Sequence, residues 1–413
     1  MRLNEEQKAM LEGKRGAPKK KAMEILTKLG EIYGAEEMVP VTSVHMPGSS
    51  VVVAGHAGTK FVEDMAAQKG KFLPFTTLNT GACDLSDEKN TIGFPEAKVE
   101  MQKRLTTAYE KMGGCPLHSC VPYLSGNLPR QGEHVAWGES SAIIFANSVL
   151  GAYTNREGGP TALAAALTGC VPAYGLHLKE NRRGQVLVNV HVPLDDINEF
   201  GTLGYFAGQI CEDRIPVFAG IKQAGIDELK MLGAALASSG AVALYHIVGI
   251  TPEAPTLEAA FNGLRPQTVL EYGKAQRDEA YAKLNRTGED EIQMVALGCP
   301  HASIREIAEI AELLSGRRVK RGIQLWVMTA LPIKTMAERM GYVKTIQEAG
   351  GRIVCDTCVI LGPMKEIMER NGLRSLATNS AKLAHYAPGQ WDLKVHYGPV
   401  RTCIEAAVNG RWN

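Results

Sequence analysis

Apolar and polar residues alternate along this chain with two different periodicities. In residues 4–34, 96–112 and 226–239, apolar side chains recur every three or four positions, which predicts helices with one buried face. Short apolar runs such as 72–78 and 185–192 lie between such segments, and the second alternates β-branched residues as a half-buried strand does. The alternation of strands and helices predicts an α/β fold with parallel or mixed sheets flanked by helices.

The C-terminal third has the most regular pattern. We expect strands at 292–297, 323–329 and 352–355, with helices at 303–314 and 333–349 between them. This order is typical of consecutive βαβ units in a parallel sheet. We also expect strands at 51–53 and 242–250, and helices that begin at Ser140 and Pro160.

The length of 413 residues is two to three times that of an ordinary domain. Residues 263–291 are highly charged and lack strong periodicity, which predicts an interdomain linker. We therefore expect three α/β domains, over residues 1–135, 136–290 and 291–413, whose boundaries are approximate and whose chain segments need not be continuous.

Composition and charge narrow the functional class. Lys and Arg number 45 against 44 Asp and Glu, so the net charge of +1 argues against a nucleic-acid binder. The sequence contains no run of 18 apolar residues, so we expect no membrane-spanning helix. Charged residues occupy the N-terminus, where a signal peptide would be apolar. Nine cysteines are too few for a disulfide scaffold, so we expect a cytoplasmic protein with reduced thiols.

Cysteines are the strongest candidates for chemistry. Cys299 and Cys358 follow predicted parallel strands one βαβ unit apart, and Cys120 lies in another loop. Three thiolates on separate loops are what an iron–sulfur cluster with one open position needs. The spacing also permits a four-thiolate zinc site built from Cys115, Cys120, Cys355 and Cys358, or a redox pair in the last two. Spacing alone leaves this choice open.

Polar clusters that could hold a small anionic substrate lie at predicted strand ends and helix starts. They occupy residues 48–50, 77–80, 139–141 and 378–382, and Arg156 precedes another helix in the segment 154–160. Capping and turn formation explain such residues equally well. The chain lacks a Walker loop, HExxH, GxSxG, GxGxxG and a kinase signature.

Several motifs occur together. They are GCPHxS at 298–303, DTC at 356–358, CxPY at 120–123, TNREGGP at 154–160, TTLN at 76–79, AWGESSA at 136–142 and TNSAKxAHY at 378–386. With this set the chain resembles the large subunits of the aconitase X family, the compact branch of the aconitase superfamily. The resemblance runs almost from end to end.

The resemblance implies the first three domains of an aconitase, with the active site between them. It implies a hydro-lyase that uses a 4Fe-4S or 2Fe-2S cluster, or a mononuclear iron. Cys120, Cys299 and Cys358 would be the iron ligands, which makes the CxxC spacing a coincidence. The residues expected at the substrate are Gly48, Ser49, Ser50, Asn79, Thr80, Ser140, Ser141, Arg156, Asn379, Ser380 and Lys382.

In this superfamily a fourth, swivelling domain supplies a serine as the catalytic base. About thirty residues follow the TNSAKxAHY motif, which is too few for that domain, so we expect a small partner subunit to carry it. The resemblance leaves two substrates, cis-3-hydroxy-L-proline and (R)-5-phosphomevalonate. Gly-Ser-Ser at 48–50 and Thr80 after Asn79 favour the hydroxyproline, with pyrroline-2-carboxylate as the product. A non-catalytic zinc-thiolate subunit is the alternative from another functional class.

Overall fold

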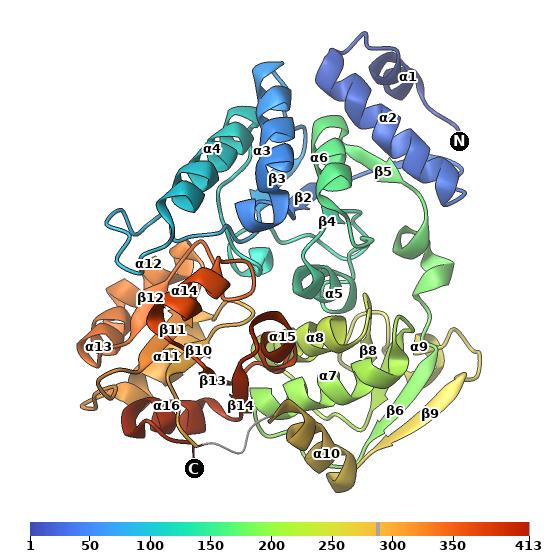
Figure 1. The fold of residues 1–413 in the computed structure, drawn as a ribbon. Coiled ribbons are helices and arrows are strands. Elements are labelled where there is room, and N and C mark those ends of the chain that lie inside the picture. The colour runs from blue at the N-terminus through green and yellow to red at the C-terminus, as the bar shows by residue number, and fades with distance from the viewer. Residues whose placement is uncertain (286–289, 413) are drawn as a thin grey trace.

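The computed structural model describes residues 1–285 and 290–412, and it confirms the predicted α/β class. Parallel sheets of three, four and five strands follow one another along the chain, and helices cover them (Figure 1). A separate antiparallel pair joins β1 to β5. No helix in the described ranges is both long and apolar enough to cross a membrane.

The N-terminal part is built around the parallel sheet β3-β2-β4. Helices α2 and α6 pack against each other beside it, and α3 packs on α4. Its elements are α1 (Glu5–Leu11), α2 (Ala17–Ile32), β1 (Met38–Pro40), β2 (Ser43–Met46), α3 (Val51–Ala67), β3 (Phe75–Leu78), α4 (Glu96–Met112), the 3-10 turn η1 (Pro122–Leu124), β4 (Ala136–Trp137), α5 (Ser140–Ser148), α6 (Gly159–Thr168) and β5 (Cys170–Pro172).

The middle part holds the sheet β8-β7-β6-β9, whose inner helices α7 and α8 make one of the closest helix contacts in the described chain. Both helices are buried along most of their length. The elements are η2 (Gly175–His177), η3 (Lys179–Arg182), β6 (Val186–Val190), α7 (Ile197–Cys211), β7 (Pro216–Ala219), α8 (Ile226–Ser239), β8 (His246–Ile247), α9 (Leu257–Ala260), β9 (Thr268–Tyr272) and α10 (Lys274–Leu284).

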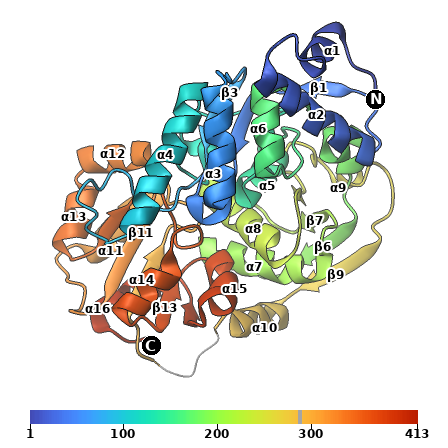
Figure 2. The ribbon, with the colours of Figure 1, turned by 45° about the horizontal axis from the view of Figure 1, so that its top comes forward.

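The C-terminal sheet has the order β12-β11-β10-β13-β14, with all strands parallel. Helix α15 leaves this sheet and packs against α7 and α8, which joins the C-terminal part to the middle part (Figure 2). Helix α5 of the N-terminal part also packs against α8. The elements are β10 (Met294–Leu297), α11 (Ile304–Leu314), β11 (Gln324–Met328), α12 (Leu331–Arg339), α13 (Tyr342–Glu348), β12 (Arg352–Val354), α14 (Met364–Asn371), β13 (Ser375–Thr378), α15 (Ala381–Trp391), β14 (Lys394–Tyr397) and α16 (Val400–Asn409).

Helix α11 shows how the sequence fixes an element next to the cysteine loops. Ser303 caps the helix by accepting a hydrogen bond from the Glu306 N–H, and the Glu306 side chain bonds back to the Ser303 N–H. Ile307, Ile310 and Leu314 recur at helical spacing and are buried against the sheet. Capping and periodicity therefore agree, and the predicted helix at 303–314 is confirmed.

Several predicted elements are wrong. Residues 51–53 open helix α3 instead of forming a strand, because Ser50 caps this helix. The helix expected to begin at Ser140 does begin there, as α5, with Glu139 as its cap. The predicted linker at 263–291 contains β9 and α10, although 286–289 lie outside the described residues. The predicted helix at 333–349 is two helices that meet at Gly341, and only His246–Ile247 of 242–250 is strand.

Candidate active site

Two of the three candidate ligand cysteines lie at the carboxyl edge of the five-stranded sheet. Gly298 follows β10 directly and has a φ of 84°, in the left-handed region. A Cβ here would lie 2.1 Å from the Met328 carbonyl oxygen, so only glycine lets the chain turn and present Cys299. Cys358 reaches the same edge after β12, because β11 pairs in parallel with both β10 and β12.

Cys120 reaches this edge from the N-terminal part of the chain. Its Sγ accepts a hydrogen bond of 3.3 Å from the backbone N–H of His301, which lies in the Cys299 loop. The three thiols line one cavity of about 260 Å³, and the Thr80 hydroxyl lies 3.8 Å from Cys358 Sγ. The other lining residues are Glu139, Ser140, Gly298, Pro300, Ile360, Leu361, Lys382, Tyr386 and Gln390.

Burial controls the protonation of these cysteines. It raises the pKa of Cys120 and Cys358 above the ordinary value and that of Cys299 to about 12. In the chain alone the thiols are therefore neutral at physiological pH. A positively charged metal group in the cavity would supply the charge that converts them to thiolates.

An ion pair between Glu139 and Lys382 forms part of the cavity wall. Lys382 Nζ donates to Glu139 Oε1 at 2.7 Å, and the two side chains are only 8% and 13% exposed. Burial raises the pKa of Glu139, but the Lys382 charge and hydrogen bonds from Lys382 and Ser141 outweigh it and lower the pKa to about 2. Burial lowers the pKa of Lys382, and the Glu139 charge more than reverses this. Both groups are charged at neutral pH.

Of the predicted substrate residues, Thr80, Ser140 and Lys382 line the cavity. Asn79 lies behind this lining, where its Nδ2 donates to Glu139 Oε2 at 3.3 Å and its carbonyl accepts from Ser49 Oγ at 2.6 Å. The predicted residues outside the lining are Gly48, Ser49, Ser50, Asn79, Ser141, Arg156, Asn379 and Ser380.

Three further polar groups among the predicted substrate residues lie outside the cavity lining. The Oδ1 atoms of Asn79 and Asn379 are buried and have no hydrogen-bond partner among the described residues. Arg156 donates to the Val242 carbonyl at 3.4 Å. Burial lowers its pKa, while the charge of Glu139 raises it, so the guanidinium lies within electrostatic reach of the cavity wall.

The residues expected at the substrate do not include Glu139, Tyr386 or Gln390, although all three line the cavity. The sequence indicates Glu139 only as a member of the polar cluster 139–141. Lys382, Tyr386 and Gln390 follow one another at intervals of four on α15. That interval places them on one helix face, so the spacing is a signal that could have identified the last two from the predicted Lys382. The ion pair of Glu139 with Lys382 has no local signal, because the two residues lie 243 positions apart.

No three His, Cys, Asp or Glu side chains in residues 1–285 and 290–412 lie where a single metal ion could bind them together. Cys355 is fully buried and its N–H bonds to Asp84, while Cys115 is partly exposed, and neither lines the cavity. The structure therefore gives no support to the four-thiolate zinc alternative. An iron–sulfur cluster spreads its iron atoms, so it needs thiolates further apart than one ion does.

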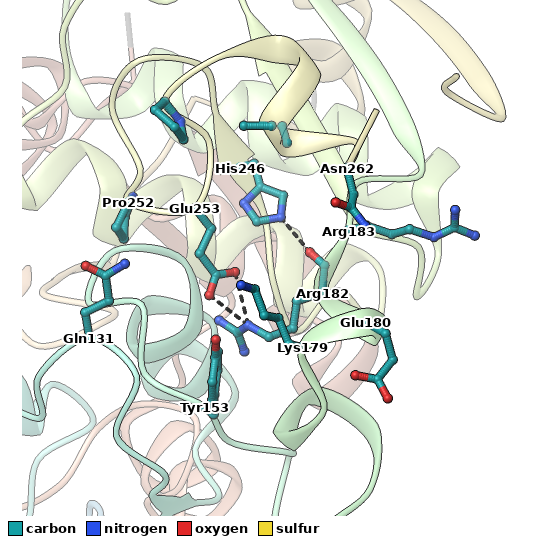
Figure 3. Close-up of a pocket in the computed structure, with 13 residues that line it drawn as sticks. Gln131, Tyr153, Lys179, Glu180, Arg182, Arg183, His246, Pro252, Glu253 and Asn262 are labelled. Carbon is teal, nitrogen blue, oxygen red and sulfur yellow. Dashed lines mark hydrogen bonds and ion pairs between the residues drawn. The ribbon is translucent and has the colours of Figure 1, made fainter. Parts of the chain in front are cut away.

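A larger cavity of about 690 Å³ lies elsewhere, beside η3 and β8 (Figure 3). Its buried Arg182 donates to both oxygens of Glu253, at 2.9 and 3.0 Å, and its guanidinium lies 4.1 Å from the centre of the Tyr153 ring. His246 bonds to the Arg182 carbonyl at 2.8 Å. Arg182 and Glu253 are thus committed to each other, and none of the described residues that line this cavity is a cysteine.

Family models cover nearly the whole chain. Models described as the first, second and third domains of aconitase X match residues 1–180, 184–282 and 292–409. A phosphomevalonate dehydratase large subunit of Methanocaldococcus jannaschii is 40% identical, with 100% of both chains covered. That of Methanothermobacter thermautotrophicus is 42% identical, with 96% of each covered.

A cis-3-hydroxy-L-proline dehydratase of Pseudomonas aeruginosa is 37% identical, and the match covers 99% of this chain and 70% of that protein. The crystal structure of Thermococcus kodakaraensis aconitase X in its holo-form superposes with a TM-score of 0.88 at 36% identity. That match covers 98% of this chain and 100% of the other.

Proposed function

Because the chain belongs to the aconitase X family and is a dehydratase, we propose that it removes water from cis-3-hydroxy-L-proline. The observation that carries this choice of substrate is the charge of the cavity wall. Glu139 and Lys382 place one negative and one positive group at the cavity. A zwitterionic amino acid presents the opposite arrangement, an ammonium for Glu139 and a carboxylate for Lys382 or Arg156.

We propose that Cys120, Cys299 and Cys358 hold an iron–sulfur cluster. Three buried thiols from separate loops, with no fourth thiol in the described lining, fit a cluster that leaves one iron open. When bound, that open iron acts as a Lewis acid that makes the substrate hydroxyl a better leaving group.

The residues of this chain hold and orient the substrate. Arg156 and Lys382 attract its carboxylate, and Glu139 faces its ammonium, while Thr80 and Ser140 offer hydroxyl groups at the cavity surface. The buried Oδ1 atom of Asn379 has no hydrogen-bond partner among the described residues and is a candidate acceptor for a substrate N–H group or hydroxyl. These contacts fix the Cα–H and C3–OH bonds in the geometry that elimination needs.

Neither of the two charged groups in the described lining is suited to remove the Cα proton at neutral pH. The pKa of Glu139 is about 2, and that of Lys382 lies above its ordinary value, so neither exchanges a proton readily near pH 7. We infer that a small partner subunit supplies a serine as the base. Loss of the proton and of hydroxide as water leaves an enamine, which tautomerises to pyrroline-2-carboxylate.

Phosphomevalonate is the second candidate, favoured by the 40% and 42% identity to archaeal large subunits over nearly their full length. This substrate carries a phosphate and a carboxylate, so it needs more positive charge than a zwitterion. Lys382 and Arg156 carry two positive charges and Glu139 one negative charge, so the site has a net charge of about +1, too little to balance a phosphate and a carboxylate together. The charge balance therefore supports the amino acid.

The test is an anaerobic assay of the chain with its small subunit against both substrates. Pyrroline-2-carboxylate from hydroxyproline, measured as its coloured adduct with 2-aminobenzaldehyde, would support the proposal. Inhibition of the reaction by inorganic phosphate would contradict the choice of substrate. Turnover of phosphomevalonate with no turnover of hydroxyproline would contradict it as well. Zinc instead of iron after anaerobic purification would contradict the cluster.

A further inference from the structure

His301 touches all three cysteine loops. Its backbone N–H donates to Cys120 Sγ at 3.3 Å, and its Nδ1 lies 3.1 Å from the hydroxyl of Ser119, the neighbour of Cys120. Its Nε2 lies 3.0 Å from the carbonyl oxygen of Thr357, the neighbour of Cys358. Cys299 lies two positions before it in the chain. The side chain is fully buried.

These bonds determine the tautomer of the imidazole. The Thr357 carbonyl can only accept, so Nε2 carries the hydrogen and Nδ1 must accept. Ser119 Oγ accepts from the Val121 N–H at 3.2 Å and has its own hydrogen free to donate to Nδ1. Both ring nitrogens are therefore committed to the protein. This arrangement positions loops and leaves the ring nothing with which to bind substrate or transfer a proton.

The His301 loop is also held from behind. The His301 carbonyl oxygen accepts a hydrogen bond from Lys230 Nζ at 3.3 Å. Lys230 is fully buried on α8, in the middle part of the chain. Lys230 forms ion pairs with Asp227, at 3.3 Å, and with Glu306 on α11. The network spans two parts of the chain, so the Cys299 loop has a fixed support on the side away from the cavity.

We propose that His301 is the positioning residue that holds Cys120, Cys299 and Cys358 at the separation required by the bound group. Each cysteine lies on a different loop, and His301 is the residue whose hydrogen bonds link the loops of Cys120 and Cys358 to its own. The inference rests on the proposed function for the identity of the bound group, since the hydrogen bonds themselves involve only this chain.

The test compares His301→Ala, His301→Gln and Ser119→Ala with His246→Ala in the full chain. His246 is a matched control, because it is also buried and bonds through Nε2 to a backbone carbonyl, but it lies beside the other cavity. The first measurement is the rate at which iodoacetamide alkylates each cysteine in the iron-free chain, followed by peptide mass spectrometry. The second is the rate of iron release to a chelator after anaerobic loading.

We expect His301→Ala to speed alkylation of Cys120 and Cys358, and to speed iron release, by about tenfold or more. His301→Gln should give alkylation and iron-release rates between those of wild type and His301→Ala, since the Gln amide offers both a donor and an acceptor. Ser119→Ala should speed alkylation of Cys120 and leave that of Cys358 unchanged, because it removes the hydrogen bond to Nδ1 only. His246→Ala should leave both measurements at the wild-type rates.

Wild-type rates in His301→Ala, or equal changes in His246→Ala, would overturn the positioning role. If His301→Ala does not fold, Ser119→Ala decides, and equal alkylation of Cys120 in that variant and in wild type overturns the proposal. A wild-type chain that binds no iron but shows thiol protection dependent on His301 would refute the cluster while supporting the positioning role. The failure of the positioning role and the failure of the proposed cluster are therefore distinguishable.

Discussion

Replacing Glu139 with Gln tests the ion pair at the cavity wall. The substitution keeps the shape of the side chain and removes its charge, which leaves the Lys382 ammonium buried without its anion. The pKa of Glu139 falls from 4.5 to about 2 in the folded chain, which corresponds to about 3 kcal/mol of stabilisation. We therefore expect Glu139→Gln to lower the free energy of unfolding at pH 7 by about 3 kcal/mol.

The same shift predicts a pH dependence. Because the folded pKa lies below the unfolded value, ionised Glu139 contributes its full stabilisation above pH 4.5. This contribution is lost as the pH falls from 4.5 towards 2. The wild-type chain should lose stability in that window relative to Glu139→Gln, so the difference between them should shrink as the solution becomes more acidic.

Urea unfolding followed by circular dichroism measures these free energies. The control is Glu63→Gln, which breaks the exposed pair with Arg104 and should cost at most about 1 kcal/mol. The double variant Glu139→Gln/Lys382→Met should recover much of the loss, because it leaves no buried charge unpaired. The reasoning fails if Glu139→Gln costs no more than Glu63→Gln, or if the effects of the two substitutions simply add.

Three further substitutions test the site. Cys299→Ser should abolish iron binding and dehydration, measured by metal analysis and assay, and full activity would remove Cys299 from the ligand set. Arg156→Lys should raise KM for the substrate roughly tenfold with little change in kcat, as expected for lost carboxylate binding, and an unchanged KM in steady-state kinetics would contradict this. Gly298→Ala should cost about 2 kcal/mol or more, because its Cβ would lie 2.1 Å from the Met328 oxygen. Gly316→Ala has the same sign of φ but open space around it, so thermal unfolding should show a smaller loss, and equal losses would refute the steric argument.

Local signals explain the elements that sequence reasoning predicts well. The helices at 96–112 and 226–239 have the predicted bounds. In the first, an apolar face at helical spacing determines the element without distant contacts, whereas the second is buried along most of its length. The convergence of Cys299 and Cys358 also follows from local reasoning. Both follow strands of one parallel sheet, and the carboxyl ends of parallel strands share an edge.

The errors arise where a pattern is weak or ambiguous. Three valines at 51–53 favour a strand by their β-branched side chains, yet the Ser50 cap and the contact with α4 give a helix, which bends at Gly55. Strand β9 lies at the edge of its sheet, and α10 buries only Ala280 and Leu284. Elements with so little buried surface leave only a faint periodicity, and the charged segment 263–291 therefore resembles a linker.

The polar contacts of the site lie beyond any local pattern. Glu139 and Lys382 are 243 positions apart, and His301 is 181 positions from Cys120, so nothing in the neighbouring residues identifies either partner. A motif can indicate that Lys382 and Cys120 matter, but only the fold shows that one is neutralised by Glu139 and the other held by His301. These two contacts set the charge of the cavity and the spacing of its thiols. Substitutions at Glu139 and His301 therefore test the proposed chemistry more directly than further substitutions within the recognised motifs would.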